Sequence, residues 1–443
     1  MGIIGKVASA IQIALGAAID QIGRRTGVIQ RLRKFSGSTL LKTLVLTSWK
    51  SPNAKPEQFA STAAQLGVTV TPQAIAKRFS PGLIAFLRES LRHVLEQAVT
   101  ATPAMVPLMR RFAAVEIGDS TTITLPEEYA DEFPGCGGKA ESGRAAVKIQ
   151  VRWDLLTGRL TKLVVEPGRT SDGRNPEADA PLPRGALSLR DLGYFSLRRF
   201  QELVVAGVHW ISRWQQGTQV FDPQGRSIDL LEQLRGHRGD EPVDRPVLLG
   251  AGERLACRLI ALRVPQEVDA RRRQAAYEKA SKHGRTPTKE HLELCGWTIM
   301  VTDCPEGLLT WKEVIVLYRA RWQIELMFKL WKSHNHLAAS RPTWSAVERM
   351  AMFWVKLIGV VLQHWLLLTS SLPEPRGSLW KAAEVIRDWI AALTVGLDDG
   401  KRLAEILERM RAAIDAIAKK KLQERHPSSF QLLLNPELLD WNC

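Results

Sequence analysis

The chain has 443 residues, 45% of them hydrophobic, which is enough for two to four domains with a large core and excludes a disordered polymer. It is basic, because 61 lysines and arginines outnumber 46 aspartates and glutamates and give a net charge of +15. Its five cysteines are scattered and form no C-x-x-C pair, which excludes a disulfide framework or a zinc ribbon and suits a reducing cytosol.

The first 110 residues are predicted to be helical and hold most of the excess charge. They contain 14 lysines and arginines against 4 aspartates and glutamates, a net of +10. Clustered basic charge is typical of a nucleic-acid-binding surface, with mere solubility as the alternative. At the start, Val7, Ile11 and Leu15 repeat at helical spacing. We therefore expect an amphipathic helix over residues 1–22 rather than a signal peptide.

Further along, this region resembles a helix-turn-helix. Residues 59–67 form a short amphipathic segment, and Thr71 can cap a second helix that begins with Pro72. The basic pair Lys77 and Arg78 follows, at positions that predict contacts with DNA. Two ordinary packed helices would give the same pattern.

From residue 111 the pattern changes to short apolar runs, which are typical of buried strands. Asp119 follows the first run and Asp191 follows the fourth. Between residues 214 and 296 the periodicity weakens, which predicts an insertion with strands of its own. The expected strands are 112–117, 145–153, 160–165, 186–189, 208–213, 246–249, 255–263 and 296–302, with a helix at 197–206.

The most informative segment is a helix predicted after the last of these strands. At about 100° per residue, one narrow stripe of this helix holds Tyr318, Arg321, Glu325 and Lys332. The other faces are apolar, so we expect a buried helix with a carboxylate between cations and a phenol. A core helix with an internal row of ion pairs is the alternative.

A long apolar run at residues 351–370 raises the question of a membrane span. Lys356, Gln363 and His364 interrupt the run. The interruptions favour a buried helix in the core of a soluble protein.

Two carboxylates at strand ends and one on a downstream helix can meet at one point. Asp119, Asp191 and Glu325 would supply three hard oxygen ligands, which suit Mg²⁺ together with water and substrate phosphate. Two such ions can clamp an in-line phosphoryl displacement. Nearby cations would then hold the phosphates of a bound DNA end.

The segment that begins at Tyr318 reads Y-x2-R-x3-E-x6-K, and it resembles the Y-R-E-K signature of bacterial insertion-sequence transposases with a DDE triad. These transposases form the insertion-sequence-four group. Asp119 in its G-D-S context and Asp191 in D-L-G-Y are similar to the two aspartate motifs of that family. The resemblance covers roughly residues 38–370.

This resemblance implies an α/β fold with an RNase H-like core, a mixed sheet with flanking helices. It implies that Asp119, Asp191 and Glu325 bind two Mg²⁺ ions, which Mn²⁺ can replace. It also implies that three further residues contact DNA near the cleavage site, namely Tyr318, Arg321 and Lys332.

Two further contacts follow from the same resemblance. Relatives cut DNA through a hairpin intermediate and flip a base onto a tryptophan of the insertion, and Trp297 lies at a comparable position. A tryptophan in a core strand is the alternative interpretation of Trp297. Arg213, at the end of its predicted strand, is expected to contact DNA.

The expected organisation has a basic DNA-binding region (1–110), the first part of the catalytic core (111–213), a β-rich insertion (214–296), the rest of the core with the Glu325 helix (297–370) and a helical C-terminal region that is the candidate for dimerisation (371–443). The expected function is cleavage and strand transfer at the inverted-repeat ends of a mobile element. We expect a homodimer or larger assembly on double-stranded DNA in the bacterial cytoplasm, associated with the nucleoid and not with a membrane. The alternatives are a metal-dependent nuclease without strand transfer and a catalytically idle DNA-binding protein of transposase origin.

Overall fold

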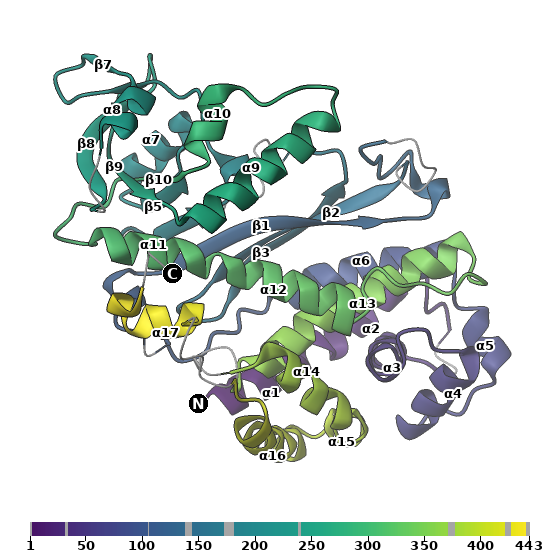
Figure 1. Cartoon of the computed structure of the whole chain (residues 1–443). Helices are drawn as coiled ribbons and strands as arrows, with labels where there is room; N and C mark the ends of the chain where they lie inside the picture. Colours follow the sequence, from purple (N-terminus) through teal and green to yellow (C-terminus); the bar gives the residue numbers. More distant parts are fainter. Residues whose placement is uncertain are drawn as a thin grey trace.

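The computed structural model describes residues 2–31, 34–104, 106–137, 144–171, 181–237, 241–370, 377–420 and 427–439. Its centre is a ten-stranded mixed sheet in the order β3-β2-β1-β4-β5-β10-β9-β8-β6-β7, with helices packed around it (Figure 1). The predicted α/β class with a mixed sheet and flanking helices is therefore confirmed.

The middle of the sheet places the two predicted aspartates on neighbouring strands. β1 pairs antiparallel with β2 and parallel with β4, and β4 pairs parallel with β5. β5 in turn pairs antiparallel with β10. The bounds are β1 (Val115–Thr124), β2 (Ala146–Asp154), β3 (Leu160–Pro167), β4 (Leu187–Arg190), β5 (His209–Arg213) and β10 (Trp297–Thr302).

β1 is longer than the sequence predicted. It was expected to end before Asp119, but it continues to Thr124, with Asp119 opposite Val151 of β2. The reason is that Thr121 and Ile123 are buried on alternate positions beyond the polar G-D-S segment. β-branched residues in this pattern extend a strand, so Asp119 lies inside β1 rather than at its end.

The predicted insertion extends the same sheet instead of forming a separate layer. β9 pairs with β10 of the core, and β8 and β6 follow outward. Three helices accompany these strands, and no residue of α9 is buried. The elements are β6 (Val220–Phe221), β7 (Ser227–Ile228), α8 (Leu230–Gly236), β8 (Val243–Leu249), β9 (Leu255–Arg263), α9 (Gln266–Ser281) and α10 (Lys289–Leu294).

The N-terminal region is helical, with two departures from expectation. The amphipathic helix expected over 1–22 is split into two helices, which meet at Gly16. The helix after Pro72 is short and ends at Ala76, so Lys77 and Arg78 follow it, and Pro81 begins the next helix. The elements are α1 (Ile3–Ala14), α2 (Ala17–Arg25), α3 (Gly37–Lys50), α4 (Pro56–Gln65), α5 (Pro72–Ala76) and α6 (Pro81–Glu96).

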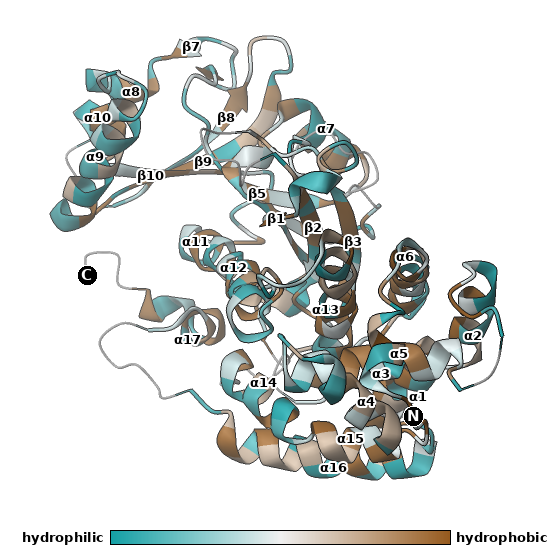
Figure 2. Ribbon diagram, turned by 90° about the vertical axis from the view of Figure 1, so that its right-hand side faces the viewer, coloured by the Kyte–Doolittle hydropathy of each residue, from teal (hydrophilic) through white to brown (hydrophobic). Residues whose placement is uncertain are grey.

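The long apolar run forms α13 (Ala346–Leu367), which packs against α3 and α6. The prediction of a buried core helix is confirmed, because its whole apolar window lies inside the protein. The polar residues are satisfied there: Lys356 Nζ donates to the carbonyls of His336 (3.0 Å) and Ala339 (2.6 Å). Figure 2 shows the apolar strands β1, β2 and β3 beside it. Ile3–Arg25 also has the length and hydropathy of a membrane span, with 44% of its apolar window buried.

The C-terminal region packs back onto both other parts of the chain. α16 contacts α1, and α17 contacts α11, the helix that leads to Glu325. Residues 371–376 and 421–426 of this region lie outside the described residues. The elements are α14 (Leu379–Asp388), α15 (Ile390–Gly396), α16 (Gly400–Ile417) and α17 (Ser429–Leu434).

Candidate active site

Asp119 lies within β1, and Asp191 directly follows the parallel neighbouring strand β4. Gly118 of β1 is paired with Arg190 of β4, so each aspartate directly follows one member of this pair. Asp191 is the first residue after β4, as the sequence predicted. Asp119 Oδ1 accepts a hydrogen bond from the backbone N–H of Ser120 at 2.8 Å.

Glu325 is brought to this place by a helical segment that packs on β1. The segment consists of α11 (Trp311–Ala320), α12 (Trp322–Lys329) and a π-helical turn, η6 (Leu330–His334). The sequence predicted one regular α-helix, and this is wrong in detail. Arg321 forms a turn between α11 and α12, and Lys332 lies in η6, where the 100° spacing does not hold.

One guanidinium joins the three predicted carboxylates. Arg321 Nη1 lies 3.2 Å from Asp119 Oδ2, and Arg321 Nη2 lies 3.6 Å from Asp191 Oδ1 and 2.8 Å from Glu325 Oε1. The side chains that the sequence expected to converge therefore do converge. The row of ion pairs offered as the alternative is also present, but it joins the helix to both strands.

The donor set suits a hard cation. The Asp191 and Glu325 side chains are 45% and 31% exposed, so their oxygens can accept further ligands. Burial raises the pKa of Asp119, and the negative charges of Asp191 and Glu325 raise it further. The Ser120 N–H and the charge of Arg321 lower this pKa, but they do not cancel the rise. A divalent cation among three carboxylates would offset the same repulsion.

Tyr318 lies between two cations next to the carboxylates. The guanidinium carbons of Arg213 and Arg321 are each 5.9 Å from the centre of its ring. Burial raises the pKa of Tyr318, so the phenol stays protonated and able to donate. Lys332 is exposed at the end of the segment. Arg213, at the end of β5, thus lies next to Tyr318.

A cavity of about 360 Å³ lies between β5, β10 and α10, and Leu192, the residue after Asp191, forms part of its wall. Trp297 is part of its wall and is only 8% exposed, so it is both a core strand residue and a lining residue. Arg272 of α9 fixes one side, donating to the Trp297 carbonyl (2.8 Å) and to Thr298 Oγ1 (2.9 Å). The lining includes Leu192, Arg213, Trp214, Arg272, His291 and Trp297.

Lys77 and Arg78 lie elsewhere. Figures 1 and 2 both place α5 away from α11 and α12, so the basic pair is not part of the carboxylate site. Lys77 is exposed. Arg78 Nη1 donates to the Val28 carbonyl at 3.1 Å, and its guanidinium lies over the Phe35 ring. Arg78 therefore binds α5 to the preceding chain.

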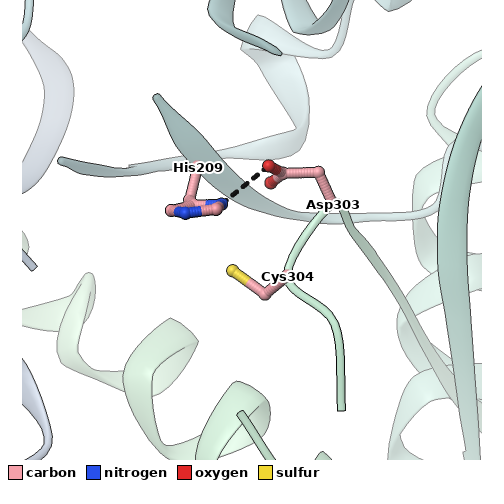
Figure 3. A group of neighbouring side chains, drawn as sticks. All are labelled: His209, Asp303 and Cys304. Atoms are coloured by element: carbon pink, nitrogen blue, oxygen red, sulfur yellow. Dashed lines mark hydrogen bonds and ion pairs between the residues drawn. The ribbon is translucent and has the colours of Figure 1, made fainter. Parts of the chain in front are cut away.

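A second group of potential metal ligands is engaged in hydrogen bonds that hold two segments of the chain together. His209, Asp303 and Cys304 lie together at the start of β5, the end opposite Arg213 (Figure 3). Asp303 accepts from His209 Nδ1 (2.8 Å) and from the Trp210 N–H (2.7 Å). Burial raises the pKa of the Cys304 thiol to about 12. These contacts tie the chain after β10 to β5.

Sequence reasoning missed several residues around the site. Trp322 follows Arg321 and is 53% exposed, and Leu326, which the sequence placed on a buried face, is 37% exposed. Trp214 and Arg272 line the cavity. An aromatic residue directly beside the Y-R-E-K arginine was the available signal for Trp322. Arg272 has no such signal, because it lies in a helix without an apolar stripe.

The chain is similar to known proteins over most of its length. Residues 112–358 match the family model described as "Transposase DDE domain". The transposase for insertion sequence element IS231B of Bacillus thuringiensis subsp. berliner is 29% identical over 340 residues, 71% of this chain and 70% of that one. The IS231F transposase of subsp. israelensis is 28% identical over 88% and 87%. The IS1151 transposase of Clostridium perfringens is 26% identical over 80% and 78%.

Proposed function

The chain belongs to the DDE transposase family, with its RNase H-like core, and we propose that Asp119, Asp191 and Glu325 are the catalytic residues of this transposase. The observation that supports these assignments best is the guanidinium of Arg321, which contacts all three carboxylates. We further propose that the enzyme cleaves and joins DNA at the inverted-repeat ends of its own insertion sequence.

The reaction of the family depends on a divalent metal ion. We propose two Mg²⁺ ions, replaceable by Mn²⁺, held by Asp119, Asp191 and Glu325. When bound, such ions activate an attacking water or 3′ hydroxyl and stabilise the leaving oxygen of the phosphodiester. The open oxygens of Asp191 and Glu325 support this choice of ligands.

The other residues of the stripe would hold the DNA. The positive charge of Arg321, beside the carboxylates, would attract the scissile phosphate, and the exposed Lys332 can approach a neighbouring phosphate as a point charge. Tyr318, protonated and flanked by Arg213 and Arg321, can donate to a phosphate oxygen. These groups would orient the scissile bond toward the carboxylates.

The cavity between β5, β10 and α10 has the chemistry of a nucleobase site. It combines tryptophan rings with arginine, and aromatic stacking is the usual way in which proteins hold an unpaired base. We propose that a base flipped out of the DNA end lies against Trp297, with Arg213 at the mouth. Such a flipped base would be expected in a hairpin intermediate, in which a base next to the cut must leave the stack.

The remaining expectations concern the assembly. We propose that the basic N-terminal region binds the inverted repeats, with Lys77 as a phosphate contact and Arg78 as a support for α5. Joining two ends requires at least two subunits on the DNA. We place the enzyme in the bacterial cytoplasm, at the nucleoid, without a membrane.

The test uses purified protein, Mg²⁺, a labelled pre-cut inverted-repeat end and plasmid target DNA. We expect joined product from the wild type, and none from Asp119→Asn, Asp191→Asn or Glu325→Gln. Glu306→Gln, which changes an exposed acid outside the site, is the matched control and stays active. Cutting without joining would favour the nuclease, and binding alone would favour the idle DNA-binding protein.

A further inference from the structure

Arg190 crosses between the two strands that bear the aspartates. It is paired with Gly118 in the parallel β1–β4 ladder. A Cβ atom built on Gly118 would lie 2.8 Å from both Cζ and Nη1 of Arg190, which is too close for any real contact. The guanidinium of Arg190 therefore lies directly over the Cα of Gly118, and a side chain at position 118 would have to displace it.

A buried ion network holds Arg190 in this place. Its Nη2 lies 3.8 Å from Glu116 Oε1, and its guanidinium lies 5.3 Å from the centre of the Tyr194 ring. Glu116, 1% exposed, is itself bound by Arg152 Nη2 at 2.5 Å and by Thr161 Oγ1 at 2.8 Å. A buried carboxylate with such partners has a fixed position, because leaving it without them is costly.

The network lies on the face of the sheet opposite the carboxylates. Successive side chains of a strand point to opposite faces, so Glu116 and the vacant side of Gly118 face away from Asp119. Arg190 thus does not contact the proposed metal site. It acts through the backbone, at the two residues that directly precede Asp119 and Asp191.

We propose that Arg190 is a positioning residue, which together with Gly118 sets the spacing of the Asp119 and Asp191 carboxylates for shared metal binding. This inference rests on the proposed function. Gly118 lets the guanidinium approach β1, and the Glu116–Arg152 pair anchors it there. The spacing of the two carboxylates is then fixed by a contact that involves neither of them.

The test combines Gly118→Ala and Arg190→Ala singly and together. Gly118→Ala displaces the guanidinium from its contacts with Glu116 and Tyr194, so we expect the affinity for Mn²⁺, measured by electron paramagnetic resonance without DNA, to fall about tenfold. Arg190→Ala removes the anchor, and a similar fall is expected. The double variant should be no weaker than Arg190→Ala alone, because the clash has gone.

Controls separate positioning from folding. Arg190→Lys keeps the charge without the planar fork, and should keep the wild-type melting temperature with intermediate Mn²⁺ affinity. Arg226→Ala, which removes an exposed arginine far along the chain, should change neither quantity. In all variants the affinity for the DNA end without metal should stay at the wild-type value, since no DNA contact is assigned to Arg190.

Two results would overturn the proposal. One is full Mn²⁺ affinity in Arg190→Ala, and the other is a double variant whose loss is the product of the two single losses. Failure of the proposed function would look different. In that case Asp119→Asn itself would still bind Mn²⁺ and join DNA, whatever Arg190 does.

Discussion

Arg321 is the residue through which the candidate site is assembled. Its guanidinium contacts carboxylates from β1, from the end of β4 and from α12. A planar group with five donors can do this, whereas an ammonium group on a flexible stem cannot hold all three directions. The residue therefore has an orienting role in addition to any contact with phosphate.

Replacing Arg321 by lysine separates these roles. Because Arg321→Lys keeps the positive charge but loses the fork, we expect single-turnover joining at saturating DNA to slow by about tenfold to a hundredfold. Affinity for the DNA end should change by less than the joining rate. A lysine variant that joins DNA at the wild-type rate would show that charge alone is needed.

His364 gives the fold a predictable response to acid. Its Nε2 donates to the Gly158 carbonyl at 2.7 Å, and burial lowers its pKa to about 4 from the ordinary 6.5. Between these values the unfolded chain binds more protons than the folded one, so the free energy of unfolding falls as the pH drops from 6.5 to 4. His334, also with a pKa of about 4, acts in the same direction.

The replacement His364→Gln can still donate to the Gly158 carbonyl but cannot titrate. We expect the variant to lose less unfolding free energy than the wild type between pH 6.5 and pH 4, whatever its stability at pH 7. Urea denaturation at a series of pH values measures this. Equal slopes for the two proteins would exclude His364 as a cause of the acid sensitivity.

At the scale of elements, α11 depends on its first turn. Thr310 Oγ1 accepts from the Glu313 N–H, and the Glu313 carboxylate accepts from the Thr310 N–H at 2.8 Å. Glu313 also binds Arg111, at 2.7 Å. The start of the helix that leads to Arg321 and Glu325 is thus fixed both locally and to the chain before β1.

We expect Thr310→Ala to lower the free energy of unfolding by about 1 kcal/mol, the usual cost of removing an N-cap side chain. Chemical denaturation measures the loss. Thr122→Ala, at an exposed position of β1, is a comparison that should cost less. If Thr310→Ala lost no more free energy of unfolding than Thr122→Ala, the capping box would contribute nothing to the stability of α11.

Several elements were predictable because their pattern is local. β9 runs over the predicted residues 255–263, since a strand buried on both faces reads as a continuous apolar run. α9 was missed because it buries no residue, and the two-residue strands β6 and β7 are too short for any periodicity. The π-helical turn at Lys332 depends on packing, not on local sequence.

The residues of the candidate site were likewise predictable only where their sequence pattern is local. Asp119, Asp191 and Glu325 could be named from the spacing of the Y-R-E-K signature and from the acids after apolar runs. The contact between Arg190 and Gly118 could not, because it depends on the register of two strands that are distant in sequence. The cavity near Trp297 depends likewise on how α9 and α10 pack on the sheet.

For the whole molecule, the charge distribution predicts how DNA binding responds to salt. The net charge is +15, and the first 110 residues supply +10 of it. Each phosphate that is neutralised releases counterions, so the affinity should fall steeply with salt concentration. The structure separates the two basic residues that follow α5, because Lys77 is exposed and Arg78 is bound to Val28 and Phe35.

We therefore expect Lys77→Ala to weaken binding to all DNA sequences and to reduce the slope of log affinity against log salt by about 1. Arg78→Ala should instead lower the melting temperature. Fluorescence anisotropy over a salt series and thermal unfolding measure the two effects. An unchanged slope for Lys77→Ala would remove α5 from the DNA-binding surface.

The proposed activity requires that three carboxylates share metal ions, and Mn²⁺ titration of the protein on a pre-cut DNA end tests this most directly. Electron paramagnetic resonance would follow bound Mn²⁺ in the wild type, Asp119→Asn, Asp191→Asn and Glu325→Gln. We predict that each substitution weakens Mn²⁺ binding and abolishes joining together. A variant that binds Mn²⁺ and joins DNA like the wild type would contradict the account.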